Sequence, residues 1–429
     1  MHQQMVGEYN QDKVVNNALM PWIVSFAASL FFFYEFIQGN MFASIADNIM
    51  HDFQIQADKM TYLSSIYYVS NVIFLFVAGM LLDRFSTKKT ILVAMLLCVL
   101  STFLLAYSHS FYLALFCRFV TGIGSAFCFL GPIRVASRWF PPQRMALVTG
   151  AIVTVAMTGG MLAQYPLTKL VVHVGWRDAL VKVGWLGVAM LIFMIYWIKD
   201  RPNQTSAHSM PHKIDLLTAA KRAYLNIRTI RAALYSSLMN MAVAVFGAMM
   251  GSLYLIQRLG VDKEDASMVN SMLFLGAIIG GPFIGWCSDR LGLRILPMKI
   301  GALLSLLVIL GILYLPVSIV GMSILFFLLG FFTAAQIISY AYVAECSPPA
   351  MTAMAVSIVS ILVQGGYIVY QNLFSTLLIH HGGMHMVDGV PVYSFGDYQA
   401  AAIILPIGLA VSLFAIMRLK ETYCRQTQG

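Results

Sequence analysis

Charged residues are scarce in this sequence. Only 10% of its 429 residues are Asp, Glu, Lys or Arg, whereas 59% are hydrophobic and the mean hydropathy is +0.78. A soluble globular domain carries roughly 25% charged residues, and a soluble chain this apolar would expose large apolar patches. The composition therefore excludes an ordinary soluble protein and indicates a polytopic membrane protein.

Several chemical signatures are also missing. The six cysteines are scattered without a CxxC pair, which argues against a disulfide framework or a zinc site. No GxxxxGK[ST], HExxH or haem-type CxxCH occurs, so the sequence predicts no enzyme, no cofactor and no metal. The spacing of His380, His381 and His385 could suggest a metal, but the neighbouring glycines and the position outside the membrane favour a flexible loop.

Long apolar runs dominate what is present. They are longer and more continuous than the roughly ten-residue strands of a membrane barrel. Helices are expected, because lipid offers no partner for unpaired backbone groups. The twelve predicted spans are 20–45, 58–82, 90–108, 111–135, 144–171, 178–198, 230–258, 266–288, 296–316, 319–343, 351–378 and 397–418.

The basic residues predict an orientation. With the N-terminus inside, 20 of the 27 Lys and Arg fall on the cytoplasmic side and 6 outside, and Arg118 falls within a span. Cytoplasmic loops carry such an excess, so both termini are predicted to be cytoplasmic. The same rule explains the net charge of +9 without nucleic-acid binding.

The second half of the chain repeats the first. Features recur at an offset of 206 or 207 residues: Gly79 and Gly285, Asp83-Arg84 and Asp289-Arg290, Gly159-Gly160 and Gly365-Gly366, Pro141-Pro142 and Pro348-Pro349. The sequence therefore predicts a six-helix bundle at 1–198, a cytoplasmic linker at 199–229 and a second bundle at 230–429. Paired six-span halves with a site near the membrane midplane are a known transporter plan.

These features resemble the major facilitator superfamily over nearly the whole chain. GMLLDRFSTKK (79–89) is similar to the family's loop between helices 2 and 3, and GWCSDRLGLR (285–294) falls at the equivalent place between helices 8 and 9. CRFVTGIGSAF (117–127) resembles its helix-4 motif. The resemblance implies an all-α fold of twelve transmembrane helices in two six-helix pseudo-repeats.

Other segments resemble the organic-anion and organophosphate branch of that family. They are FFFYEFIQGN (31–40), RWFPPQR (138–144), VGWRDAL (174–180) and FGDYQAA (395–401). That branch often carries an arginine just after YEF, where this chain has Gln38, Gly39 and Asn40. The helix-5 antiporter signature is incomplete too, because Val155-Ala156 stand where Gly-Pro is expected.

The resemblance implies a secondary active transporter with alternating access. The expected substrate is a small polar, anionic organic solute, and the expected mode is proton symport by a monomer in the bacterial inner membrane. The expected partners are the substrate, protons and the bilayer. Two alternatives stay open: an efflux carrier for a metabolite, siderophore or drug, and a transporter-like solute sensor.

Two charged residues lie deep within predicted spans. A charge there is costly and is by default a functional hypothesis. In one interpretation Arg118 attracts an anionic substrate group, while Glu35 loads and releases a proton. In the other, the two residues neutralise each other and hold helices 1 and 4 together. Because the second half has no Lys or Arg deep in a span, an anionic group is expected near the first half.

Further polar residues mark possible faces of a central cavity or a cytoplasmic gate. The cavity candidates are Gln38, Tyr67, Asn71, Asn240, Gln336, Tyr340, Gln364, Tyr367 and Gln371. The gate candidates are Asp83, Arg84, Arg138, Asp289, Arg290 and Glu345. Glu345 is predicted to pair with Arg290 or Arg294, and Arg138 with Asp83.

Overall fold

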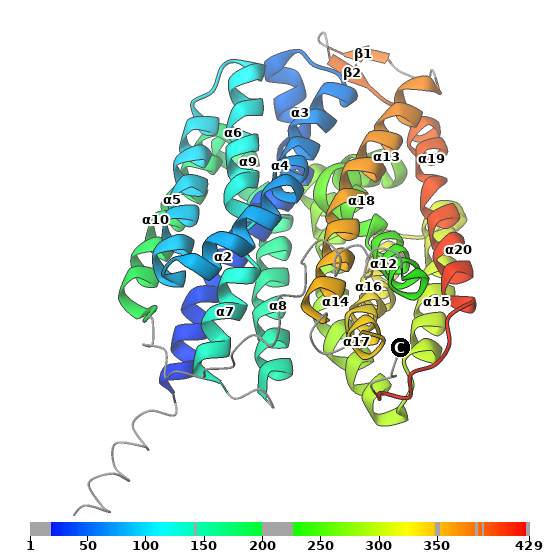
Figure 1. Ribbon diagram of the computed structural model, residues 1–429. Coiled ribbons are helices and arrows are strands. Elements are labelled where there is room, and N and C mark those ends of the chain that lie inside the picture. Colours follow the sequence, from blue (N-terminus) through cyan, green and yellow to red (C-terminus); the bar gives the residue numbers. More distant parts are fainter. Residues whose placement is uncertain are drawn as a thin grey trace, which may run out of the picture.

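The protein is described by a computed structural model that covers residues 19–140, 144–199, 226–347, 352–381, 385–387 and 390–425. Figure 1 shows two groups of helices side by side, with α2 to α10 in one and α12 to α20 in the other. Both ends of the described chain lie at the same end of the bundle. We call this the terminal end and the opposite one the far end.

The first group accounts for six passes across the bundle, three of them interrupted. Its helices are α2 (Met20–Asn40), α3 (Phe42–Phe53), α4 (Ala57–Arg84), α5 (Thr87–Ala106), α6 (Phe111–Ser125), α7 (Leu130–Trp139), α8 (Met145–Leu162), α9 (Tyr165–Val174) and α10 (Trp176–Trp197). Most of the predicted linker, 200–225, lies outside the described residues.

The second group also makes six passes. Its helices are α12 (Ile227–Met239), the π-helix η2 (Val243–Met250), α13 (Gly251–Leu259), α14 (Lys263–Leu291), α15 (Ile295–Tyr314), α16 (Ile319–Thr333), the 3-10 helix η3 (Ala334–Ile337), α17 (Ile338–Glu345), α18 (Thr352–His380), α19 (Phe395–Ala402) and α20 (Ile404–Met417).

Eleven helical segments in the described part of the chain are long and apolar enough to cross a membrane. The 28-residue α4 makes a further pass between α3 and α5. Its stretch 65–82 carries no charged residue. Its polar residues Thr61, Ser64, Ser70 and Asn71 are all buried. The architecture is thus consistent with twelve passes.

Two short strands lie in the loop between α18 and α19, outside the helices of the all-α fold. β1 (His385–Val387) pairs antiparallel with β2 (Val390–Val392), where the sequence predicted a flexible loop. The intervening Asp388-Gly389 is a dipeptide that favours a tight hairpin. The hairpin lies at the far end, outside the membrane-spanning helices.

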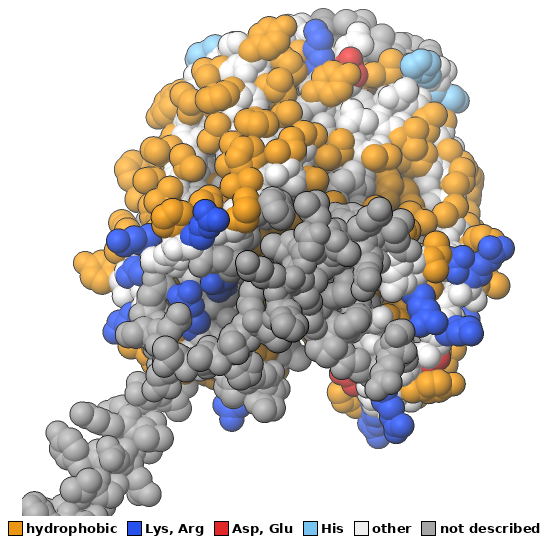
Figure 2. All heavy atoms as spheres, in the orientation of Figure 1, with side chains coloured by type: hydrophobic (Ala, Val, Ile, Leu, Met, Phe, Trp, Pro, Cys, Tyr) orange, Lys and Arg blue, Asp and Glu red, His pale blue; other side chains and the backbone are white. Residues whose placement is uncertain are grey.

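The repeated charged loops are short helix-to-helix turns. The Ser86 side chain caps α5 by accepting a bond from the Lys89 N–H at 3.3 Å. In the second copy, α14 ends at Gly292, whose φ of +66° is the left-handed conformation that glycine adopts without a steric cost. Both turns lie at the terminal end, where Figure 2 shows most of the Lys and Arg of that face.

Glycine allows close approach between helices in the first half. A Cβ on Gly122 of α6 would lie 2.2 Å from the Tyr67 carbonyl oxygen of α4. A Cβ on Gly159 of α8 would lie 2.2 Å from the Phe33 carbonyl oxygen of α2. Small residues bring membrane helices together in this way, and here they place α6, which carries Arg118, against α4, which carries Tyr67, and α8 against α2, which carries Glu35.

The two halves are joined by polar contacts at the far end. The Lys263 ammonium donates to both carboxylate oxygens of Asp47, at 2.6 and 2.9 Å, and to the Asn48 side-chain oxygen at 2.7 Å. The Ala57 N–H donates to the Tyr393 hydroxyl at 3.3 Å. These bonds hold α3 and α4 of the first half against α14 and the segment before α19.

A fully buried glutamine extends this junction inward. The Gln164 amide nitrogen donates to the Gly247 carbonyl at 2.8 Å, and its oxygen accepts from Asn270 at 2.7 Å. The Asn270 amide also donates to the Phe246 carbonyl at 3.0 Å. The π-helical segment is therefore bonded to side chains of both halves.

Candidate functional site

Two of the interrupted passes in each half occupy equivalent places. The first and fourth passes break between α2 and α3 and between α6 and α7. The seventh contains the π-helix η2 and the tenth the 3-10 helix η3, so the second half is interrupted at the matching positions. Substrate sites of secondary transporters are typically formed by discontinuous helices at corresponding positions of the two halves.

A charged cluster lies beside the breaks in the first half. Glu35 of α2 is 1% exposed, and its Oε2 accepts a hydrogen bond from the Tyr67 hydroxyl at 3.1 Å. Arg118 of α6 is 0% exposed, and its guanidinium carbon lies 4.6 Å from the centre of the Tyr67 ring and 4.7 Å from that of Phe42. Tyr67 thus connects the acid to the base.

Glu35 and Arg118 make no ion pair with each other in the described structure. Arg118 is held instead by its two aromatic faces and by one bond from Nε to the Leu63 carbonyl at 3.3 Å. A desolvated cation–π contact contributes about 2 kcal/mol, less than the several kcal/mol per ion that burial costs. Direct neutralisation, the second interpretation of this pair, is not the geometry found.

Several polar atoms of the cluster lack a hydrogen-bond partner of normal geometry. They are Nη1 and Nη2 of Arg118, Oε1 of Glu35, both amide atoms of Gln38 and Oδ1 of Asn40. Buried polar atoms are nearly always satisfied in folded proteins. This concentration of donors and acceptors next to interrupted helices is what a site for a polar ligand requires.

A second polar group lies in the other half. Asn240 follows α12 and donates to the Ser236 carbonyl at 2.9 Å. The Ser236 hydroxyl donates to the Gln336 side-chain oxygen of η3 at 2.7 Å. Ser236 thus contacts both Asn240 and Gln336, next to the breaks of passes seven and ten. Tyr340 of α17 is half-buried one turn after Gln336.

α4 and α18 connect the two halves near this region. The Gln364 amide lies 3.5 Å from the Asn71 side-chain oxygen, and the rings of Tyr68 and Tyr367 have centroids 4.7 Å apart. The Tyr68 hydroxyl donates to the Gly39 carbonyl at 3.0 Å, next to Gln38. The predicted residues Gln364 and Tyr367 therefore contact the first half.

Gln371, predicted on the same stripe as Gln364, lies elsewhere. Its amide nitrogen donates to the Ala244 carbonyl of η2 at 3.0 Å, which leaves its Oε1 without a partner. It is fully buried. Gln371 therefore supports the π-helix rather than the α4–α18 contact.

The gate candidates of the second half form one cluster at the terminal end. Arg294 contacts Glu345 at 2.8 Å and Asp289 at 2.6 Å. Burial alone lowers the pKa of Arg294, but its hydrogen bonds with Glu345 and Asp289 outweigh burial and raise the pKa above its ordinary value. Arg290 lies over the Trp286 ring at 5.1 Å. The cluster lies within one half, so a latch between halves stays a prediction.

The gate candidates of the first half are less fully described. Arg84 ends α4 and is exposed, and Arg138 lies on α7 next to Trp139. Asp83 belongs to α4, but its side chain lies outside the described part of the structure. The predicted pair of Asp83 with Arg138 therefore stays a prediction.

The sequence did not single out the C-terminal residues that complete the second cluster. Both Glu421 oxygens accept backbone bonds, from Arg294 N–H at 2.6 Å and Ile295 N–H at 2.8 Å. The Thr422 hydroxyl donates to Glu345 at 2.5 Å. A carboxylate is favoured at a helix start, but the sequence does not show that Glu421 reaches α15.

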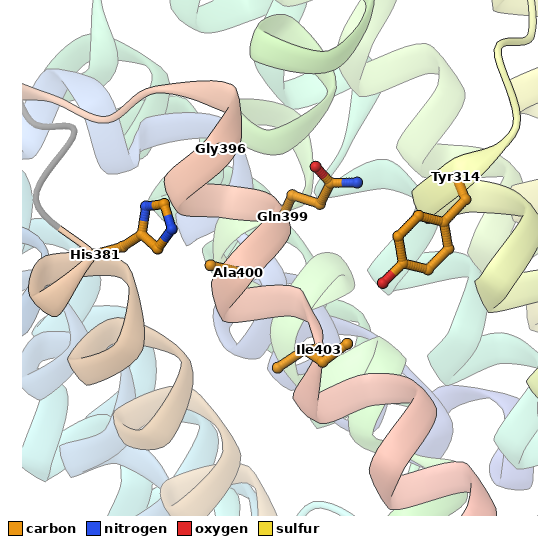
Figure 3. A pocket seen from close by; sticks show the side chains of 6 residues that line it. All are labelled: Tyr314, His381, Gly396, Gln399, Ala400 and Ile403. Carbon is orange, nitrogen blue, oxygen red and sulfur yellow. The ribbon is translucent and has the colours of Figure 1, made fainter.

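An open pocket lies away from the charged cluster, at the far end. It has a volume of about 460 Å³, and Figure 3 shows His381 on one side of α19 and Gln399 with Tyr314 on the other. His381 Nδ1 is 2.9 Å from Oδ1 of the buried Asp397. Within the described residues, no three His, Cys, Asp or Glu side chains are arranged to hold a metal ion.

Comparison with known proteins agrees with the arrangement of helices. The family model described as "Major Facilitator Superfamily" matches residues 24–250 and 232–423. A solved structure, described as a bacterial homolog to human lysosomal transporter Spinster in an inward-facing and occupied conformation, is similar with a TM-score of 0.73. It is 15% identical, over 92% of this chain and 95% of that one, so this likeness shows the fold alone.

Two curated relatives are similar in sequence. The Hexuronate transporter of Bacillus subtilis (strain 168) is 22% identical over 263 residues, which cover 59% of this chain and 61% of the relative. The Membrane sensor protein UhpC of Escherichia coli (strain K12) is 26% identical over 309 residues, which cover 66% of this chain and 69% of the relative. The chain thus spans less than two thirds of the length of the hexuronate transporter.

Proposed function

Because the chain belongs to the major facilitator superfamily, with relatives in its organic-anion and sugar-phosphate branch, we propose that it is a secondary active transporter of a small organic anion. Transport proceeds by alternating access, in which two six-helix bundles, 1–198 and 230–429, rock about a midplane site. The segment 199–229 tethers them. The anion moves together with a proton, and both termini of the protein lie in the bacterial cytoplasm.

One observation carries the substrate part of this proposal. Arg118 is fully buried, yet both of its terminal nitrogens lack a hydrogen-bond partner. A carboxylate or phosphate accepts two parallel bonds from this fork and supplies the negative charge that Arg118 lacks in the described structure. Gln38, whose amide atoms lack a hydrogen-bond partner of normal geometry, is placed to bond hydroxyl or carboxylate groups of the same solute.

The proton part of the proposal rests on Glu35. Its carboxyl group is buried and shares Tyr67 with Arg118, so binding of an anion at Arg118 changes the field at Glu35. A carboxyl that charges and discharges as the substrate comes and goes couples the two movements. Intramembrane acids have this role in proton relays.

The junction of the halves assigns a conformation within the proposal. The bonds of Lys263 and Gln164 hold the far end together. With both chain ends cytoplasmic, as the Lys and Arg distribution indicates, the far end is the periplasmic side. We infer that the conformation is the one closed toward the periplasm.

Transport assays in proteoliposomes test the proposal. With an imposed pH gradient and a panel of hexuronates, aldarates and sugar phosphates, we expect uptake that Arg118→Gln abolishes and Arg118→Lys restores poorly, because lysine lacks the fork. Glu35→Gln should remove the response to pH while leaving substrate exchange intact. Asp265→Asn, which neutralises an exposed carboxylate at the start of α14, is the control. Uptake by Arg118→Gln equal to that of the unmodified protein would rule out Arg118 as the anion site.

A second candidate function is that of a solute sensor that binds an organic anion without transporting it, since a relative is a membrane sensor protein. The same preparation separates the two functions. A sensor binds one of these anions, with affinity lost in Arg118→Gln, but shows no uptake or counterflow. A transporter shows both binding and flux.

A further inference from the structure

A groove on the first half is separate from the charged cluster. It runs between α4 and α5, has a volume of about 580 Å³, and its floor is formed by Ile123 and Phe127 near the α6–α7 break. Its walls include Phe74 of α4 and Leu97 of α5. The groove is apolar along most of its length.

The length of the groove matches one leaflet of a membrane. Phe74 lies ten residues before Arg84 on α4, which corresponds to about 15 Å of helix. Half of a hydrocarbon core of about 30 Å is also about 15 Å. The groove therefore extends from the terminal end to the middle of the bilayer, and Val93, 58% exposed, lies along its open side.

The mouth of the groove is basic and polar. Arg84 and Lys89, both exposed, line it together with Ser86 and Thr90. None of the described lining residues is acidic. A third basic residue of the α4–α5 turn, Lys88, donates to the Ile195 carbonyl of α10 at 2.7 Å and does not line the groove.

The turn between α14 and α15, which repeats the sequence pattern of the α4–α5 turn, has different contacts. There Arg290 lies over the Trp286 ring, and Arg294 is paired with Asp289 and Glu345. Arg290 and Arg294 of the second copy are thus engaged by protein groups, whereas Arg84 and Lys89 of the first copy line an apolar groove. The two loops share a sequence pattern but offer different surfaces.

We propose that this groove binds an anionic phospholipid, with an acyl chain between α4 and α5 and the phosphate at Arg84 and Lys89. Basic pockets between transmembrane helices on the cytoplasmic side bind anionic lipid headgroups, and each nearby Lys or Arg contributes about 1 kcal/mol. A soluble phosphate would use only the mouth. A phospholipid uses the mouth and the apolar walls together.

Native mass spectrometry of the purified full-length protein tests this site. Titration with phosphatidylglycerol should show one retained lipid, and phosphatidylcholine should be retained less. The double change Arg84→Gln with Lys89→Gln should weaken phosphatidylglycerol binding roughly 25-fold, a factor of about five for each charge. The control Arg228→Gln with Lys299→Gln removes two other charges outside the groove and should leave binding unchanged.

Filling the groove separates an acyl-chain site from adsorption to a basic surface. Val93→Trp adds bulk on the open side without entering a buried core, and it should weaken lipid binding while the mouth stays intact. Glycerol 3-phosphate at millimolar concentration should not displace the lipid. The proposal is overturned if phosphatidylcholine binds equally well, if the control variant loses binding as the mouth variant does, if Val93→Trp has no effect, or if glycerol 3-phosphate competes.

Discussion

The salt bridge at the far end should set the balance between the two conformations. Lys263 makes three bonds to the other half, two to Asp47 and one to Asn48. Its side chain is 16% exposed and that of Asp47 is 39% exposed, so water screens the pair in part. Exposed pairs contribute up to about 1 kcal/mol and hydrogen bonds to charged groups about 1.5 to 3, which suggests about 1 to 2 kcal/mol here.

Lys263→Met removes this contribution only where the far end is closed. Each half retains its own core, so we expect little change in the unfolding temperature. The population open at the far end should rise roughly 5-fold to 30-fold, the ratio that corresponds to about 1 to 2 kcal/mol. The change should appear as a redistribution between two distances rather than as a continuous drift.

Spin labels at the exposed positions 56 and 265, on opposite halves, report this distance by double electron–electron resonance. The charge-swapped protein, Lys263→Asp with Asp47→Lys, should return toward the original distribution. Lys169→Met removes an exposed charge at the same end, whose contact in the described part of the chain is with the Tyr165 ring of its own half, and should change nothing. An unchanged distribution in Lys263→Met would refute the latch.

Three further predictions concern stability. Gly122→Val should impair folding and lower the melting temperature in a thermal-shift assay, because a Cβ at position 122 would lie only 2.2 Å from the Tyr67 carbonyl oxygen. Burial alone raises the pKa of Asp52, but bonds from Trp176 and Arg177 outweigh it and hold the pKa below 3.8. These bonds therefore stabilise the folded protein above pH 3.8, and the stabilisation is lost as the pH falls through the lower pKa that Asp52 has in the folded state. Asp52→Asn should destabilise the protein at neutral pH but not in strong acid. Glu421→Gln should loosen the C-terminal segment and increase its proteolysis, a result that equal cleavage rates would contradict.

The membrane architecture could be read from the sequence because lipid imposes a strong pattern. Long apolar runs predicted eleven of the passes that the structure describes as apolar helices, and the position of α4 is consistent with the twelfth. Helix interruptions were not predicted. Hydropathy does not register a π-turn such as η2, since all eight of its residues are buried and apolar or glycine.

The site was predictable in its residues but not in its contacts. A charged residue inside an apolar run can be recognised from the sequence, as Glu35 and Arg118 were. Their connection through Tyr67 depends on how α2, α4 and α6 are rotated, which one sequence does not fix. The contacts of Gln164 and Lys263 were missed because a polar residue near the end of a span has no sequence signal for a partner about 100 to 200 residues away.

The hydrogen bonding of the far end has a consequence for solvent. When the halves part there, the Gly247 carbonyl, the Gln164 amide and the Lys263 ammonium all lose partners at once. An unsatisfied group in hydrocarbon costs several kcal/mol, so these groups must be hydrated as they separate. Opening toward that side therefore takes up water, and closing expels it. Osmotic stress, which lowers the activity of water, should favour the closed form even though no residue has been changed.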